Sequence, residues 1–366
     1  MSRSRARCHL GLADFLRGGR GRSGGFTLVE LLVTIAIIAV LLGILIPAIG
    51  AVRNGAKKAT TQSLMTAVTT SITQFRTQTS RLPGFFSQGE LAQPGQESGL
   101  TAMENALFDL AGGVIPNGQP RPQTAFDLTV AGRTITVDPL AVGASDGPGY
   151  LNLGAQFTRS AGSGGAGGAV EGGWSQGTQG LAPARPRVDQ TGNATIFEPA
   201  TTRYQIPDII DPFGKPIMLW VNNDAVGSEP GVTFAARTAP TLGSANPPSR
   251  FYWQSNYGYL EAESQRGASA LANSRTDEQL LRAMAAVLGN PSFSQPIASG
   301  GITADDPAEP AAPRGDFILH SAGRDGVFMD VGTAATPIQY HYIPTGLTPP
   351  AGIRVVTDSD DLIQGG

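Results

Sequence analysis

A single carboxylate, Glu30, interrupts the apolar run GGFTLVELLVTIAIIAVLLGILIPAI at residues 24–49. A carboxylate near the start of a membrane helix is energetically costly unless it pairs with a cation or lies at the hydrated membrane interface. Two roles are open for it. Glu30 either lies at the membrane interface, where the helix dipole tolerates a negative charge, or pairs with a cation from another chain and fixes the register between chains. If Glu30 acts chemically, ion pairing is the interaction that we expect of it.

The remaining polar residues form no recognisable catalytic set. The sequence has no nucleophile elbow, no P-loop and no paired His-Glu metal helix. His320 and Ser321 are neighbours in sequence, which does not make them a dyad. An aromatic cluster at residues 252–259 is more typical of sheet packing than of a ligand platform. We therefore expect a protein that is not an enzyme.

The apolar run is long enough to span a membrane. Residues 31–49 are nineteen positions without a charge, which suffices for a spanning helix. Six arginines and one acid, Asp14, precede it, and this imbalance predicts a cytoplasmic N-terminus. Pro47 removes one helical hydrogen bond. It is either a harmless kink at the membrane exit or a weak point that lets the helix bend when it packs.

The helical pattern resumes after Pro47. Leu64, Val68, Ile72 and Phe75 form one apolar stripe, and Pro83-Gly84 is expected to end the helix. We therefore predict one helix from residue 26 to about residue 80. It comprises a transmembrane or filament-core part at 26–49 and an amphipathic part at 50–82, and a globular head follows at 83–366.

The head is predicted to be α+β, with an antiparallel sheet against the long helix. Capping patterns start helices at Thr101 and Thr276, which end near Gly112 and Gly289. A hairpin is expected at 126–137, turning at Ala131-Gly132. Residues 143–185 form a glycine-rich insertion. The other strands are expected at 217–221, 251–260, 317–320, 338–343 and 353–356.

The string Gly25-Phe26-Thr27-Leu28-Val29-Glu30, followed by an apolar helix with Pro47, resembles the type IV prepilin and pseudopilin family. The resemblance implies that a membrane prepilin peptidase cuts between Gly25 and Phe26 and methylates the new amino group of Phe26. It also implies that Glu30 pairs with the N-terminal amine of a neighbouring subunit. An ordinary secretory signal ending near Ala48 or Ala51 would need a shorter apolar region and would leave Glu30 unexplained.

Loss of a 25-residue leader would change the net charge and the cysteine and histidine content of the chain. The leader holds six arginines and one aspartate, so the mature chain has 20 basic and 28 acidic residues and a net charge of −8. This charge argues against a nucleic-acid-binding surface for the protein as a whole. The only cysteine, Cys8, lies in the leader, which excludes disulfides in the mature chain. Only His320 and His341 remain, which argues against a His/Cys metal site.

Two segments of the head resemble the major pseudopilin of type II secretion systems more narrowly. They are the turn DPFGKP at 211–216 and the strand and loop DFILHSAGRDG at 316–326. The resemblance implies a Ca²⁺ site that uses Asp325 and a late acidic residue, best matched by Asp361, with Asp358 nearby. Calcium prefers six to eight oxygen ligands. This sequence departs from the family by placing about 35 residues between the loop and the late aspartate, and a solvated acidic tail beside an Asp-Gly turn remains the alternative.

The resemblance implies a pilin-like structural subunit of a type II secretion pseudopilus or a type IV pilus-like filament. Its expected partners are the prepilin peptidase, other pilin subunits and an inner-membrane assembly platform. We expect a single-pass inner-membrane protein with its head in the periplasm, which can be extracted into the filament. With 341 mature residues it is large for a main shaft subunit, which favours a minor one. The alternative is a membrane-anchored binding module, such as an adhesin or a DNA-uptake minor pilin.

Overall fold

The computed structural model describes most of the chain after the leader. The described residues are 25–94, 100–122, 125–138, 141–143, 148–151, 209–223, 232–241, 243–245, 248–260, 265–272, 274–293, 309–333 and 338–366, with the backbone alone at 173–174, 187–188 and 194–196. Residues 1–24, with Cys8, and most of the glycine-rich insertion lie outside this set. The chain divides into two compact units, Met1–Arg53 and Asn54–Gly366.

The longest element is helix α1, Leu28–Thr79, which runs without interruption through Pro47. Its apolar stripe is buried as expected; the buried apolar residues are Leu64, Met65, Val68, Ile72 and Phe75. On the exposed side the hydroxyls of threonines such as Thr66 and Thr70 bond the carbonyl one turn back. The helix ends before Pro83, because Ser80 adopts a left-handed conformation with φ of 58°.

Three shorter helices of the head begin with capping boxes, in which a Ser or Thr and a Glu or Gln three residues later satisfy each other's backbone amides. They are α2 (Gln88–Leu91), α3 (Ala102–Leu110) and α5 (Asp277–Leu288). The starts predicted at Thr101 and Thr276 are confirmed, whereas α2, capped by Ser87, was not expected.

The predicted hairpin is confirmed as strands β2 (Phe126–Val130) and β3 (Arg133–Val137). Ala131 and Gly132 both have positive φ, 49° and 79°, which is typical of the type I′ turn that suits the twist of a hairpin. A short strand, β1 (Val114–Ile115), extends this sheet in the antiparallel order β1-β3-β2.

The central sheet of the head consists of β8 (Met218–Val221), β11 (Phe317–Ser321) and β14 (Leu362–Gly365), in the antiparallel order β14-β11-β8. All five residues of β11 are buried. Leu319 belongs to the core cluster that includes the α1 stripe, and its neighbour Ile318 belongs to a second cluster with α5. The sheet is therefore covered on both faces, which explains why all of β11 is buried, including its polar residues His320 and Ser321.

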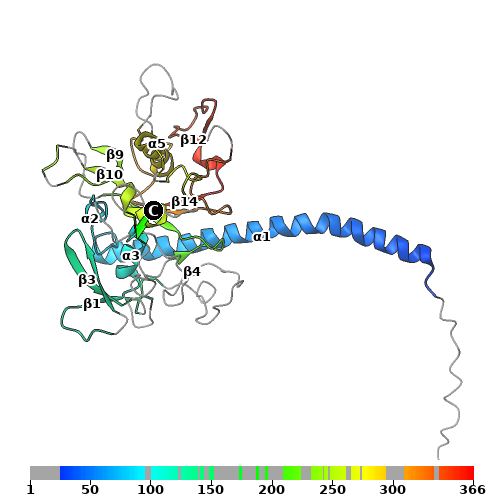
Figure 1. Ribbon diagram of the computed structural model, residues 1–366, viewed down its shortest axis with the longest axis horizontal. Coiled ribbons are helices and arrows are strands. Elements are labelled where there is room, and N and C mark those ends of the chain that lie inside the picture. Colours follow the sequence, from blue (N-terminus) through cyan, green and yellow to red (C-terminus); the bar gives the residue numbers. More distant parts are fainter. Residues whose placement is uncertain are drawn as a thin grey trace, which may run out of the picture. The chain divides into compact units, whose positions relative to one another are not determined.

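Side chains also tie α1 to this sheet. Gln364 of β14 donates to Thr69 Oγ1 at 3.1 Å, and Arg76 pairs with Asp316 beside β11. The fold is thus α+β, with antiparallel sheets and a long N-terminal helix, as the sequence predicted (Figure 1).

The smaller strands differ in part from expectation. They pair as β4 (Gly173–Trp174) with β7 (Ile209–Ile210), β5 (Arg187–Val188) with β6 (Ala194–Ile196), β9 (Thr233–Ala236) with β10 (Ser249–Tyr252), and β12 (Gln339–Tyr340) with β13 (Ile353–Arg354). The last two pairs are parallel. The strands predicted at 338–343 and 353–356 are therefore shorter than expected.

The strand predicted at 251–260 is wrong beyond Tyr252. The chain turns there into the 3₁₀ helix η3 (Trp253–Asn256) and then into α4 (Tyr257–Leu260). Trp253 is buried, its indole N–H donates to the Leu271 carbonyl at 2.8 Å, and its ring meets Tyr257 edge-on. The aromatic residues thus pack as a core, but they are spaced for helical turns rather than for alternation along a strand.

Candidate functional site

Glu30 lies in the first turn of α1 and is held by Thr27, the residue before the helix. The Thr27 amide and hydroxyl donate to Glu30 Oε2 at 2.9 and 2.8 Å, and the Glu30 amide donates to Thr27 Oγ1 at 3.2 Å. These contacts form a capping box. This capping box was not predicted, although Thr27-Leu-Val-Glu30 has the same spacing as the capping patterns at Thr101 and Thr276.

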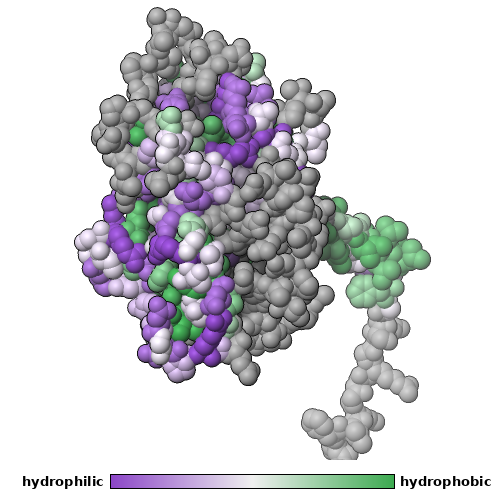
Figure 2. All heavy atoms as spheres, turned by 60° about the vertical axis from the view of Figure 1, so that its left-hand side comes forward, coloured by the Kyte–Doolittle hydropathy of each residue, from purple (hydrophilic) through white to green (hydrophobic). Residues whose placement is uncertain are grey.

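The N-terminal part of α1 has an uncovered apolar surface. Every large apolar side chain from Phe26 to Val52 is exposed within the described residues. Figure 2 shows this segment as a continuous hydrophobic surface. A helix that is apolar on all sides is either the core of a larger assembly or a membrane span. By length and composition α1 can cross a membrane.

A second set of polar contacts joins the two head segments singled out in the sequence. Ser321 Oγ donates to Asp211 Oδ2 at 2.6 Å, and Asp211 Oδ1 accepts from the amides of Phe213 and Lys215, each at 2.9 Å. Lys215 in turn packs against Gly326, where a Cβ would overlap its side chain. Burial raises the pKa of Asp211, although these hydrogen bonds oppose the shift. The turn at 211–216 and the loop at 321–326 therefore form one structural unit.

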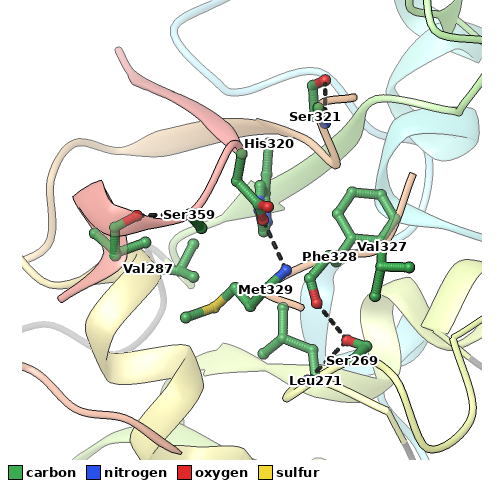
Figure 3. Close-up of polar contacts among 12 residues, drawn as sticks. Ser269, Leu271, Val287, His320, Ser321, Val327, Phe328, Met329 and Ser359 are labelled. Carbon is green, nitrogen blue, oxygen red and sulfur yellow. Dashed lines mark hydrogen bonds and ion pairs between the residues drawn. The ribbon is translucent and has the colours of Figure 1, made fainter. Parts of the chain in front are cut away.

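His320 points to the other face of β11, because successive residues of a strand alternate. Its Nε2 lies 2.5 Å from Asp361 Oδ2, and both side chains are fully buried. The same carboxylate oxygen accepts from the Met329 amide at 2.8 Å (Figure 3). His320 and Ser321 thus have separate partners, Asp361 and Asp211, and do not form a dyad.

The segment before β14 folds back onto the 321–326 loop. Asp360 Oδ2 accepts from the amides of Arg324 and Asp325 at 2.7 and 3.1 Å. Gly323 has a positive φ of 66°, and a Cβ there would overlap the Asp360 carbonyl. The close approach therefore requires glycine at this position.

The comparisons with known proteins bear on the N-terminal region. Residues 20–46 match the family described as the prokaryotic N-terminal methylation motif. The chain carries the methylation motif of type IV prepilins. No curated protein and no solved structure was found to match the chain. The narrower resemblance of residues 211–216 and 316–326 to the major pseudopilin is not confirmed.

Within the matched residues, Gly25 and Phe26 lie just before α1 and Glu30 lies in its first turn, while Pro47 follows the match and lies inside the helix. Their predicted roles in cleavage, methylation and assembly stay predictions. So do the boundaries predicted for the leader, the two helix segments and the head.

The predicted calcium ligands do not form one set. Asp360 and Asp361, rather than Asp358, are among the carboxylates whose charges act on Asp325. Asp358 is exposed in the short helix η4 (Val356–Asp358). Among the residues that the structure describes, no three His, Cys, Asp or Glu side chains are grouped to hold a metal ion. Asp325, Asp358 and Asp361 therefore do not fit a calcium ion in this arrangement, and Asp361 acts as the partner of His320.

We expect the Asp325→Asn variant to be more stable than the parent chain at pH 7. Partial burial and then the neighbouring carboxylates, chiefly Asp360, raise the pKa of Asp325 to about 6, against a hydrogen bond from the Val327 amide that lowers it. Because folding raises this pKa above its unfolded value of 3.8, the folded state favours the protonated carboxyl. The stability that the protonated carboxyl contributes is present below pH 3.8 and is lost as the pH rises through the folded pKa. Asparagine removes this ionisation.

The measurement is the melting temperature of both chains at pH 4 and pH 7. The advantage of Asp325→Asn should appear at pH 7 and largely vanish at pH 4. If the two chains differ in melting temperature by the same amount at pH 4 and pH 7, the raised pKa of Asp325 is contradicted.

Proposed function

We propose that the chain is a pilin-like structural subunit that assembles through its N-terminal helix. The observation that carries this proposal is the match of residues 20–46 to the methylation motif. The exposed apolar surface of α1 supports it, because such a surface needs either lipid or neighbouring helices as cover. Assembly through the N-terminal helix also suits head-to-tail contacts that do not close, which produce a helical filament.

In this proposal the chain is inserted in the inner membrane with its N-terminus in the cytoplasm and its head in the periplasm. The prepilin peptidase cleaves after Gly25 and methylates Phe26. Related subunits and an inner-membrane assembly platform then draw the helix into a secretion pseudopilus or a type IV pilus-like filament. The role is structural rather than catalytic, and the size of the head favours a minor subunit.

Processing of the N-terminus tests this proposal. Mass spectrometry of the full chain, expressed with and without a prepilin peptidase, should find a chain that begins at N-methylated Phe26 only when the enzyme is present. The Gly25→Leu variant should stay uncut, because the peptidase must admit a new side chain next to the scissile bond. An uncut parent chain, or a cut near Ala48 at the end of the apolar run, would contradict the proposal.

A further inference from the structure

A small pocket lies in the head between α5 and β12, which are neighbours in the fold (Figure 1). Its volume is about 80 Å³. Its polar lining consists of Arg275, Gln279, Arg282, Gln339, Tyr340 and His341, and three apolar residues complete it. Neither an Asp nor a Glu belongs to this lining.

The two arginines differ in how their charge is balanced. Arg282 pairs with Glu278, one turn earlier on α5. Arg275 donates instead to two neutral groups, the carbonyls of Gly267 at 2.7 Å and Ser269 at 3.1 Å. In the described part of the chain no carboxylate lies within ion-pair distance of Arg275. The pocket therefore retains about one positive charge.

His341 adds a buried polar atom rather than a charge. It is 4% exposed, and burial followed by the charge of Arg282 lowers its pKa, so the ring is neutral near pH 7. Its Nε2 contacts both Gln339 Oε1, at 3.4 Å, and Arg282 Nη1, at 3.5 Å, which leaves Nδ1 as the second polar atom of the ring. This Nδ1 is buried and has no hydrogen-bond partner among the described residues. A buried polar atom without a partner is costly unless a ligand satisfies it.

We propose that this pocket binds a carboxylate group. The site offers guanidinium and amide donors, which match the planar, two-oxygen geometry of that anion. Its single net charge suits a monoanion better than a phosphate group, which carries about −1.5 to −2 at neutral pH. The volume exceeds what one water needs but is far below the roughly 300–1,000 Å³ of sites for cofactor-sized ligands. This binding activity goes beyond the proposed structural role of the chain.

The carboxylate can come from a free small acid or from an acidic side chain of a partner protein. Titrations of the full chain in detergent micelles, followed through the ring resonances of His341, distinguish these sources. The probes are acetate, the blocked tripeptide acetyl-Ala-Glu-Ala-amide, its Gln counterpart and inorganic phosphate. We expect acetate to bind with a dissociation constant of about 1 mM, because so small a ligand makes few contacts. Tighter binding of the Glu peptide than of acetate assigns the site to a protein side chain, and the reverse order assigns it to a free acid.

The informative variant is Gln279→Glu, which keeps the capping box of α5 and adds a negative charge to the pocket wall. It should weaken binding of the carboxylate at least about tenfold. Gln119→Glu, which adds the same charge in an exposed turn away from the pocket, should leave binding unchanged. Arg275→Gln should also lose binding. Because Arg275 donates to two loop carbonyls, that loss could come from local unfolding, whereas Gln279→Glu tests the charge of the pocket without removing these contacts. Absence of binding, stronger binding of phosphate, equal binding of the Glu and Gln peptides, or indifference to Gln279→Glu would overturn the proposal.

Discussion

Replacing Glu30 with valine is expected to abolish filament assembly while the chain still inserts into the membrane. Valine extends the apolar run, so insertion has no reason to fail. It removes the carboxylate that would pair with the amine of a neighbouring Phe26, and an unpaired charge away from water is strongly unfavourable. We expect the assembled material recovered from sheared cells to fall at least about tenfold, as truncation of one partner in a desolvated charge pair commonly does.

The Glu30→Gln variant separates the capping contact that the structure shows for this residue from the predicted ion pair. Glutamine can keep the capping box with Thr27, because Glu and Gln both serve at that position. It cannot neutralise a neighbouring amine. Assembly should therefore fail with Glu30→Gln as it does with Glu30→Val. If Glu30→Gln assembles like the parent chain, Glu30 serves as a helix cap and the predicted ion pair is contradicted.

The second large effect is expected from Asp361→Ala, which should strongly destabilise the head. This change leaves the buried His320 ring and the Met329 amide without their partner. Each buried group left without its partner costs about 1–3 kcal/mol, so we expect a loss of about 3–5 kcal/mol for the two together. For a domain of this size we expect the melting temperature to fall by about 6–20 °C.

The control for Asp361→Ala is Asp358→Ala. Asp358 is exposed, so its removal should change the free energy of unfolding by less than about 0.5 kcal/mol. Asp361→Asn keeps the size of the side chain and can still accept from Met329, so it should fall between the two. A melting temperature of Asp361→Ala equal to that of Asp358→Ala would contradict the structural role assigned to Asp361.

Much of the helical structure could be predicted because its signals are local. The apolar run and the stripe from Leu64 to Phe75 predicted α1, and the capping patterns at Thr101 and Thr276 located α3 and α5. Ala131-Gly132 located the hairpin. The capping box of Thr27 and Glu30 was equally local and could have been found, since its residue types and spacing match those at the other caps.

The contacts that build the head are not local and could not be read from spacing. His320 meets Asp361 across 41 residues, and Ser321 meets Asp211 across 110. Strand β14 pairs with β11 although its short segment, LIQG, carries no distinctive alternation. The same limit applies to the pocket, because α5 and β12 contribute its polar residues from separate parts of the chain. These contacts depend on which distant segments pair in the fold, and the hydrophobic periodicity of a single sequence does not show that pairing.

Cysteine cross-linking along α1 tests the central claim most directly. The only native cysteine, Cys8, precedes the predicted cleavage site, so a mature chain carries no background thiol. Single cysteines placed at successive positions from Leu31 to Ile46 should give covalent dimers at positions on one face of the helix in host cells, and these dimers should disappear in the Glu30→Val background. Monomers alone, or dimers that form equally at all positions and survive Glu30→Val, would contradict assembly through this helix.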